Sequence, residues 1–450
     1  MKNKILVVPG NTDLNRGDQA LVWESIRLFE DLYPNLELYL YESGSTIEEK
    51  NLQKSQTQSR GYNFITRILL HPRVKVKSGS NKSKEVNYSK ITFVKWGFVA
   101  VFDLFNTLLL ISRFRFMNRL GRSTLSSEQK RSLDLFPSLK ALVVKGGGFL
   151  HSYGKLQDPY VMYYFLFDLM LAHRYKVKTV VLPNSIGPLK NKLAKYLVAK
   201  VLKKSTFVSV REDVSKKFVL ENLGLVVPKF PDLGFFLKNS DFNSEEYLIK
   251  KGLKLQKKNI AITLRPYRFD GYDNPSELYG QYLTEIKNFI ERQINEGYEI
   301  TLFAHTLGPS AHEDDRLALK DVYKAIDKQY NSSLHYLEDF DLDCRQVQTI
   351  YSHFNILIGT RFHSVIFALN AGTPAIAVAY GGNKSYGIMK DIGISEYVVG
   401  IESVRALKLN ELTTQLASQK KQYLIKLINY QVQLSNERLN LIDKIKKALK

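Results

Sequence analysis

The chain has 450 residues, more than one typical domain, so we expect two domains that each bury their own core. It carries 65 lysines and arginines against 44 aspartates and glutamates, and the net charge of +21 favours an anionic partner: nucleic acid, an anionic membrane face or a negatively charged polymer. The single cysteine, Cys344, excludes an internal disulfide and a cysteine metal cluster, which fits a reducing cytoplasm.

The chain opens with the first unit of an α/β sheet. Residues 4–8 predict a buried strand, and the apolar run before Pro9 is too short for a signal peptide. A polar loop, a helix over about 17–33 and a strand over 36–41 follow. The loop places polar side chains at the carboxyl end of the first strand: Asn11, Asp13, Asn15, Arg16 and Asp18.

The α/β pattern breaks between about residues 43 and 138. In the run from Phe98 to Ile111, 11 of 14 residues are apolar, but Asp103 and Asn106 interrupt it. The run is shorter than the roughly 20 apolar residues of a spanning helix. It predicts a buried core helix, a dimer helix or a helix lying in a membrane interface. Basic residues flank it on both sides: Arg60, Arg67, Arg73, Lys75, Lys77, Lys82, Lys84, Arg113, Arg115, Arg119 and Arg122.

Three later strand exits of the first half carry glycines or polar groups. The predicted strand from residue 139 ends in three glycines that include Gly147, where backbone N–H groups can approach a ligand. The turn lacks the G-x-G-x-x-G spacing and the P-loop lysine, so neither a dinucleotide site nor an NTPase site is predicted. The next strand ends at a polar turn with Asn184, and Arg211 and Glu212 lie at a third exit.

Basic side chains follow four predicted strands of the second half, namely Arg265, His305, the pair Arg361 and His363, and Lys384. Ligands of open parallel sheets bind at the carboxyl ends of the strands. The helix that begins near His363 also offers unpaired N–H groups and partial positive charge. The convergence of these residues at one sheet edge therefore predicts an anionic ligand.

Other site classes find no support in the sequence. There is no H-E-x-x-H motif, and the acidic run 313–315, expected at a helix start, has only His312 beside it, so no metal site is predicted. No G-x-S-x-G elbow is present, which argues against serine hydrolysis. The basic residues are scattered and no reader motif appears, so we expect no nucleic acid as partner.

A set of motifs follows one order along the chain, over roughly residues 4–20 and 140–395. They are Asn15-Arg-Gly-Asp-Gln-Ala20, Gly146-Gly-Gly-Phe-Leu150, Pro183-Asn-Ser-Ile-Gly-Pro188, Val208-Ser-Val-Arg-Glu-Asp213, Pro231-Asp-Leu233, Gly359-Thr-Arg-Phe-His-Ser364, Gly372-Thr-Pro374 and Lys384. In these motifs the chain resembles the polysaccharide pyruvyl transferase family. The segment between about residues 43 and 138 has no counterpart in that pattern.

The resemblance implies an α/β fold of two Rossmann-like domains that face a cleft, similar to the GT-B architecture. We expect an acceptor domain at 1–238, which holds the basic and apolar insertion at about 43–138, a phosphoenolpyruvate domain at 239–404 and a helical tail at 405–450. It also implies transfer of the enolpyruvyl group of phosphoenolpyruvate, as donor substrate without further cofactor, to a sugar of a capsule, exopolysaccharide or other cell-surface polymer precursor as a pyruvate ketal.

In that family the Arg-x-His element belongs to the phosphoenolpyruvate site, which corresponds to Arg361 and His363. The substrate carries a phosphate and a carboxylate and needs at least two cationic groups, for which we predict Arg361 and Arg265. Lys384 and His305 lie at the same predicted edge. Histidine can protonate the methylene carbon near neutral pH, so His363 is the candidate acid.

A second group must accept the proton of the sugar hydroxyl, and Asp13, Asp18 and His305 are the candidates. We expect the first-domain loops, with Asp13, Asn15, Gly147 and Asn184, to face the sugar. Two alternatives stay open: a GT-B-type glycosyltransferase that uses a nucleotide sugar, and a non-catalytic polysaccharide-assembly protein.

The net charge and the run from Phe98 to Ile111 suggest an acceptor presented at a membrane, such as a lipid-linked oligosaccharide. We therefore expect a cytoplasmic protein, peripheral at the inner face of the plasma membrane. The sequence leaves open whether the chain forms a homo-oligomer.

Overall fold

The computed structural model describes residues 3–10, 12–72, 90–381 and 384–450. Asn11 and the basic flanking residues from Arg73 to Lys84 lie outside the described part. The chain divides into two compact units. Unit 1 comprises Met1–Asp13, Leu21–Leu233 and Asn436–Lys450, and unit 2 comprises Leu14–Ala20 and Gly234–Ser435. The predicted boundary near residue 238 lies close to the observed one, but the short segment Leu14–Ala20 belongs to unit 2.

Unit 1 is built on one parallel sheet with the strand order β3-β2-β1-β4-β6-β5, in which β7 also pairs with β6. The apolar runs of the central strands are buried on both faces, as a parallel sheet covered by helices requires. The sequence predicted a strand that ends at the three glycines. The structure adds a further strand, β5, which begins within this glycine run. The strands are β1 (Asn3–Val8), β2 (Leu36–Tyr41), β3 (Asn63–Ile65), β4 (Leu139–Val144), β5 (Gly147–Ser152), β6 (Lys178–Leu189) and β7 (Phe207–Val210).

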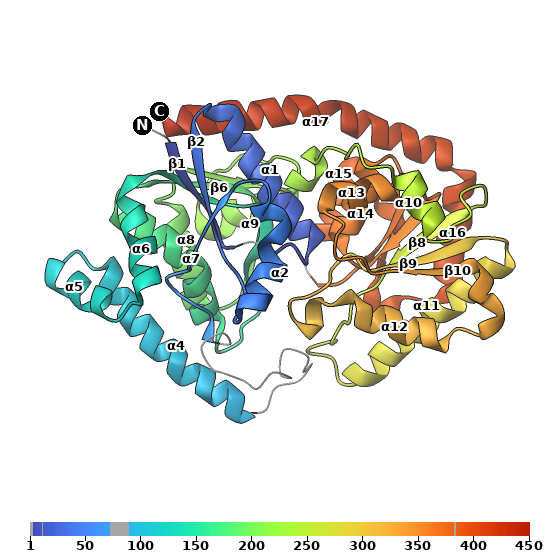
Figure 1. Cartoon of the computed structure of the whole chain (residues 1–450), viewed down its shortest axis with the longest axis horizontal. Coiled ribbons are helices and arrows are strands. Elements are labelled where there is room, and N and C mark those ends of the chain that lie inside the picture. The colour runs from blue at the N-terminus through green and yellow to red at the C-terminus, as the bar shows by residue number, and fades with distance from the viewer. Residues whose placement is uncertain (1–2, 11, 73–89, 382–383) are drawn as a thin grey trace. The chain divides into compact units, whose positions relative to one another are not determined.

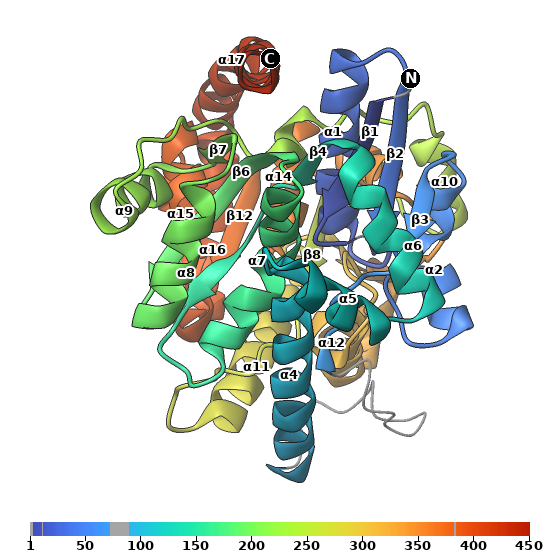
Figure 2. The same cartoon turned by 90° about the vertical axis from the view of Figure 1, so that its left-hand side faces the viewer.

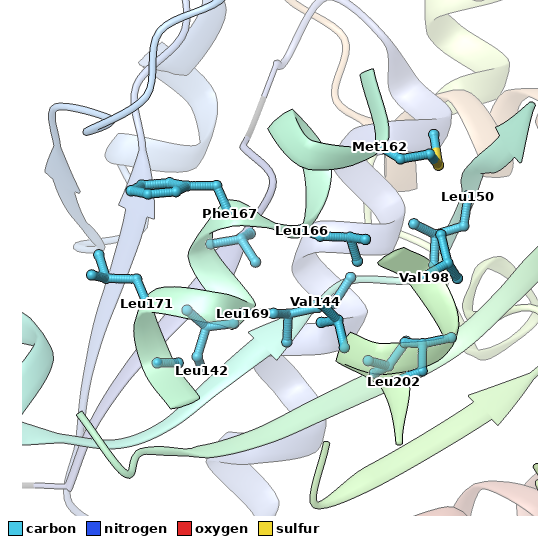
Figure 3. Packing of buried hydrophobic residues seen from close by; sticks show 14 of the residues in the cluster. Leu142, Val144, Leu150, Met162, Leu166, Phe167, Leu169, Leu171, Val198 and Leu202 are labelled. Atoms are coloured by element: carbon cyan, nitrogen blue, oxygen red, sulfur yellow. The ribbon is translucent and has the colours of Figure 1, made fainter. Parts of the chain in front are cut away.

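Helix α7 supplies much of the apolar core of unit 1. Figure 3 shows Leu166 and Leu169 of α7 near Val144 of β4, with Val198 and Leu202 of α8 nearby, and all belong to one buried cluster. The helices of this unit are α1 (Arg16–Leu32, which starts in the segment that belongs to unit 2), α2 (Ile47–Gln58), α4 (Lys90–Ile111), α5 (Arg115–Ser123), α6 (Ser127–Leu135), α7 (Asp158–Arg174), α8 (Lys192–Leu202) and α9 (Asp213–Leu223).

Unit 2 contains a six-stranded parallel sheet with the order β10-β9-β8-β11-β12-β13. Numbered within the unit, this is 3-2-1-4-5-6, the strand order of a Rossmann fold, and its order reverses between β8 and β11. The two parallel α/β domains predicted from the sequence are thus confirmed. The strands are β8 (Asn259–Thr263), β9 (Glu299–Phe303), β10 (Leu334–Leu337), β11 (Ile356–Gly359), β12 (Ala375–Ala379) and β13 (Val398–Gly400).

The helices of unit 2 include α14, which follows β11 directly and is buried along almost its whole length. Helices α11, α12, α13, α14 and α15 each lie between two consecutive parallel strands, as crossover connections require. They are α10 (Ser244–Lys250), α11 (Pro275–Asn295), α12 (Asp315–Ala325), α13 (Cys344–Tyr351), α14 (Phe362–Asn370), α15 (Lys384–Ile392) and α16 (Ala406–Ser418).

The predicted helical tail is confirmed as α16 and the 30-residue helix α17 (Lys420–Leu449) (Figure 1). The first part of α17 belongs to unit 2, where the Tyr423 hydroxyl donates to Ala375 O at 2.9 Å and accepts from Ala375 N at 3.0 Å. Its last part belongs to unit 1, where Arg438 pairs with Asp31 at 2.6 Å. The helix thus contributes to the packing of each unit.

The packing in Figure 3 predicts how unit 1 responds to a cavity. Leu166→Ala should lower the free energy of unfolding by about 2–5 kcal/mol, because Leu166 is fully buried and its neighbours relax only in part. The matched control Leu156→Ala removes the same atoms from a side chain that is 95% exposed, and should change stability by less than about 0.5 kcal/mol. Urea unfolding measures both, and equal midpoints would contradict this packing.

Candidate functional site

The candidate site lies in unit 2, where the strand order reverses. The exits of the two central strands are joined, because Thr360 N and Thr360 Oγ1 both donate to Thr263 O, at 3.0 and 3.1 Å. One residue further along, Arg361 is the N-cap of α14, and Arg265 leaves the neighbouring exit after β8. Two of the predicted cationic residues therefore lie at the topological switch point, where open α/β sheets bind ligands.

Arg361 is held by a buried carboxylate. Its Nε donates to Asp315 Oδ1 at 2.7 Å, and its Nη2 donates to His312 O at 3.3 Å. Asp315 Oδ2 accepts from Thr306 N at 2.8 Å, so the carboxylate itself is fixed. Burial raises the pKa of Asp315 to about 6, although Arg361 opposes that rise. At neutral pH the pair is thus ionised, and Asp315 orients the guanidinium.

Arg265 lies against aromatic rings. Its guanidinium carbon is 4.1 Å from the ring centre of Tyr380 and 5.6 Å from that of Tyr267. Among the described residues no group accepts a hydrogen bond from its buried Nε. Stacking on tyrosine fixes the plane of a guanidinium, and the N–H groups at its edge stay able to donate to a ligand. Arg265 is therefore positioned to present N–H donors.

His363 and Lys384 meet at the start of two helices. Lys384 Nζ lies 3.3 Å from His363 Nε2 and 5.4 Å from the ring centre of Phe362. An ammonium group has only donors, so Nε2 accepts and the neutral imidazole carries its proton on Nδ1. The other side of the ring contacts Gly17, where an added Cβ would lie 2.3 Å from His363 Nδ1. Only a glycine at this position leaves room for the imidazole.

The segment Leu14–Ala20 packs in unit 2 through its backbone and Arg16. Arg16 is buried, and its Nε and Nη2 donate to Leu342 O at 3.1 Å and Asp339 O at 2.6 Å. Asn15 pairs with Thr306 in an isolated β-bridge, and Asp18 accepts from Asn15 Nδ2 at 3.2 Å. We expected Asn15 and Asp18 among the loops of the first domain. These contacts place them in unit 2, next to the glycine that contacts His363.

His305 is a buried part of the site. It is 1% exposed, its Nδ1 lies 3.1 Å from the Tyr351 hydroxyl, and its ring stacks on Tyr351. Burial, followed by the nearby His363 and Arg16, lowers the pKa of His305 well below its ordinary value. The imidazole is therefore neutral near pH 7, which argues against the cationic contact to phosphoenolpyruvate that the sequence suggested.

The other predicted acceptor residues lie in unit 1 and serve its packing. Asp13 accepts from Thr57 N at 3.0 Å and from the Thr57 hydroxyl, which ties the first loop to α2. Asn184 is buried and donates to Lys145 O and Leu182 O at 3.0 and 2.8 Å, and Gly147 pairs with it across β5 and β6. Each of these polar groups thus has a structural task.

Sequence reasoning missed the roles of Asp315 and Arg16. Asp315 was assigned only to a helix start, and its position beside a histidine-bearing strand exit gave no indication of its partner Arg361. Arg16 lies within a matched motif, but its acceptors at Asp339 and Leu342 are more than 300 residues away. No three or more His, Cys, Asp or Glu side chains are grouped to hold a metal in the part of the chain that the structure describes.

The raised pKa of Asp315 predicts a pH-dependent stability. Between the ordinary value of 3.8 and about 6 the folded chain holds a proton that the unfolded chain has released, so this contribution is present at low pH and is lost as the pH rises through about 6. Relative to Asp315→Asn, the wild type should lose about 3 kcal/mol of unfolding free energy between pH of about 4 and 7. Denaturant unfolding at several pH values measures this, with Asp314→Asn as control. A pH-independent difference would contradict the raised pKa.

Comparisons with known proteins show the fold and the family of the chain. The chain is 26% identical over 288 residues to the amylovoran biosynthesis protein AmsJ of Erwinia amylovora, and the match covers 60% of this chain and 64% of the relative, which is less than two thirds of its length. Among solved structures, UDP-GlcNAc 2-epimerase of Neisseria meningitidis has a TM-score of 0.56 at 13% identity and covers 99% of this chain and 100% of its own. UGT73P12 of Glycyrrhiza uralensis has a TM-score of 0.59 at 9% identity, with 100% and 96% covered.

At these identities the solved structures show the fold alone, and they confirm the GT-B class predicted from the sequence. The model of one family, polysaccharide pyruvyl transferase, matches residues 15–382, which include the Asn15–Ala20 segment and the exits of β8, β9, β11 and β12. The chain therefore belongs to the polysaccharide pyruvyl transferase family.

Proposed function

We propose that the chain transfers the enolpyruvyl group of phosphoenolpyruvate to a sugar of a polysaccharide precursor as a pyruvate ketal. The observation that carries the proposal is the meeting of Arg265, Arg361, His363 and Lys384 at the switch point of one Rossmann-ordered sheet. Family membership and the relation to an exopolysaccharide biosynthesis protein support a polysaccharide as acceptor.

The cationic groups suit the two anionic ends of phosphoenolpyruvate. Two of the five N–H donors of Arg361 bind Asp315 and His312, so the remaining donors of its fixed fork can bind phosphate or carboxylate oxygens. Arg265, whose guanidinium lies over the Tyr380 ring, supplies the second fork. Arg361 keeps N–H donors beyond those that bind Asp315 and His312, and Arg265 offers its own, so each arginine can bind one acidic group. This supports a donor with two separate acidic groups.

The contact between Lys384 and His363 provides a way to protonate His363, the candidate acid. When a substrate anion draws the ammonium group of Lys384 away, Nε2 of His363 loses its donor and can take a proton. The protonated imidazole then gives this proton to the methylene carbon of phosphoenolpyruvate. Gly17 holds the ring in place from the opposite side.

The bonds of the reaction balance without a further reactant. Protonation of the methylene carbon forms a C–H bond and leaves positive charge on the carbon that bears the phosphate. A sugar hydroxyl adds there, inorganic phosphate leaves, and a second hydroxyl closes the ketal. Of the two hydroxyl protons, one replaces the proton spent by His363 and one leaves with phosphate.

Asp18 is the base that the geometry favours. Asp13 is bonded to Thr57 in unit 1, and His305 is buried against Tyr351. Asp18 is half-buried and follows Gly17, the residue that contacts His363. The cytoplasmic location, the absence of a further cofactor and the lipid-linked acceptor stay predictions from the sequence.

The anion site predicts a selective loss of binding. Lys384→Met should weaken phosphoenolpyruvate binding at least about 10-fold, because a charge-assisted hydrogen bond to the substrate is lost. Lys390→Met, an exposed lysine of the same helix, is the matched control and should bind as the wild type does. Isothermal titration calorimetry measures both. Arg361→Ala, compared with Arg292→Ala, tests the fork in the same way, and undiminished affinity in both site variants would refute the anion site.

The acid and base roles predict the opposite pattern, a loss of turnover with binding retained. His363→Gln and Asp18→Asn should each lower phosphoenolpyruvate-dependent phosphate release about 100-fold or more, while phosphoenolpyruvate binding stays within about threefold. The exposed carboxylate of α12 provides the control Asp321→Asn. The assay uses a panel of glycan acceptors. Full ketal formation by His363→Gln would rule out its role as the acid.

The rival glycosyltransferase is separated by a thermal-shift screen. A ligand that binds the folded chain raises its melting temperature, so phosphoenolpyruvate should stabilise the protein and nucleotide sugars should not. Stabilisation by a nucleotide sugar alone would favour the rival. An assembly protein without catalysis would show neither stabilisation by phosphoenolpyruvate nor turnover with any acceptor.

A further inference from the structure

Helix α4 exposes many of its apolar side chains and buries two of its polar ones, Asp103 and Thr107. Asp103 and Thr107 face unit 1, where the Thr107 hydroxyl lies 2.8 Å from the Tyr163 hydroxyl of α7. The opposite side carries Phe98, which is 76% exposed, with further exposed side chains at 101, 102, 105 and 108. These positions recur every three or four residues and so form one stripe. A helix that faced water would show the reverse arrangement.

Helix α5 packs on the C-terminal end of α4, where Asn118 Nδ2 donates to Leu109 O and Leu110 O at 2.7 and 3.0 Å, and α5 exposes further apolar side chains. Phe114 and Phe116 are both more than 70% exposed, and Figures 1 and 2 show α4 and α5 at the periphery of unit 1. So many large exposed apolar side chains on two neighbouring helices exceed the single scattered ones that are ordinary on a soluble protein. This α4–α5 surface, residues 90–123, therefore requires an apolar partner.

The charge of the α4–α5 surface selects that partner. Residues 90–123 contain six lysines and arginines and a single acidic residue, Asp103, which is buried. Arg113, Arg115 and Arg119 are exposed beside Phe114 and Phe116. Phenylalanines interleaved with arginines, without an exposed carboxylate, fit the boundary between anionic lipid headgroups and acyl chains. A second copy of this surface would instead bring like charges together.

We propose that the α4–α5 surface binds anionic membranes with the apolar stripe inserted at the interface. The stretch Val94–Ile111 could cross a membrane by length and composition, and 22% of it is buried. Its Thr107 side is packed on α7, however, so lipid cannot surround the helix while unit 1 keeps its core. The helix therefore lies along the membrane. This inference is independent of the proposed reaction and concerns where the chain acts.

Vesicle flotation of the full chain tests the proposal. Wild type should float with phosphatidylcholine vesicles that contain 30–40% phosphatidylglycerol (about a third of the lipid) and bind at least about 10-fold more weakly to pure phosphatidylcholine. The triple variant Phe98→Ser, Phe102→Ser, Phe105→Ser should lose flotation. The triple variant Arg113→Ala, Arg115→Ala, Arg119→Ala should bind anionic vesicles roughly 100-fold more weakly, at about 1 kcal/mol per arginine.

Matched controls distinguish binding by the α4–α5 surface from non-specific hydrophobic adsorption and from the effect of net charge. One control removes three exposed apolar side chains elsewhere in unit 1, in the triple variant Leu156→Ser, Leu193→Ser, Val226→Ser. The other removes three exposed charges there, in the triple variant Lys140→Ala, Lys203→Ala, Lys216→Ala. Both control variants should float as the wild type does. Unchanged melting temperatures confirm folding. Flotation that both α4–α5 variants retain would overturn the proposal. A different outcome would assign the surface to a second copy of the chain: the wild type does not bind vesicles and sediments as a dimer, whereas the phenylalanine variant sediments as a monomer.

Discussion

The buried pair of Arg361 and Asp315 is the constraint on which the candidate site depends. A guanidinium at the end of a buried strand carries a large desolvation cost, and the carboxylate of α12 offsets it while fixing the plane of the fork. Asp315 is in turn anchored by the backbone of Thr306. The exits of β9 and β11 and the start of α12 are thus tied together by one ionic contact. That contact fixes the geometry of the anion site.

Other contacts complete the site from distant parts of the chain. Gly17 approaches His363 so closely that no side chain fits, and Arg16 fixes its segment to carbonyl groups of unit 2. A family motif near the N-terminus thereby serves the second Rossmann-like sheet. One solved structure of similar fold, UDP-GlcNAc 2-epimerase of Neisseria meningitidis, acts on a nucleotide sugar by its name, and its 13% identity shows a shared fold alone.

Much of this could be predicted from the sequence, because local rules govern it. Apolar runs located the strands, and the rule that parallel sheets bind ligands at their carboxyl ends placed Arg265, Arg361 and His363 together. The position of Asn15 and Asp18 could not be predicted, since it depends on contacts with residues about 300 positions away. The partner of Asp315 was hidden as well, because Arg361 is 46 positions away and follows a different strand. The reversed polarity of α4 needed the structure, since sequence periodicity alone does not say which face packs on the protein.

The central claim is that the cationic edge of unit 2 binds phosphoenolpyruvate in a reactive pose. A crystal structure of the complex tests this most directly. Our account predicts the phosphate and carboxylate of the ligand against Arg361 and Arg265, with the methylene carbon within reach of His363 Nε2 and Lys384 turned toward the anion. Phosphoenolpyruvate bound away from these residues, for example beside Arg211 of unit 1, would contradict it.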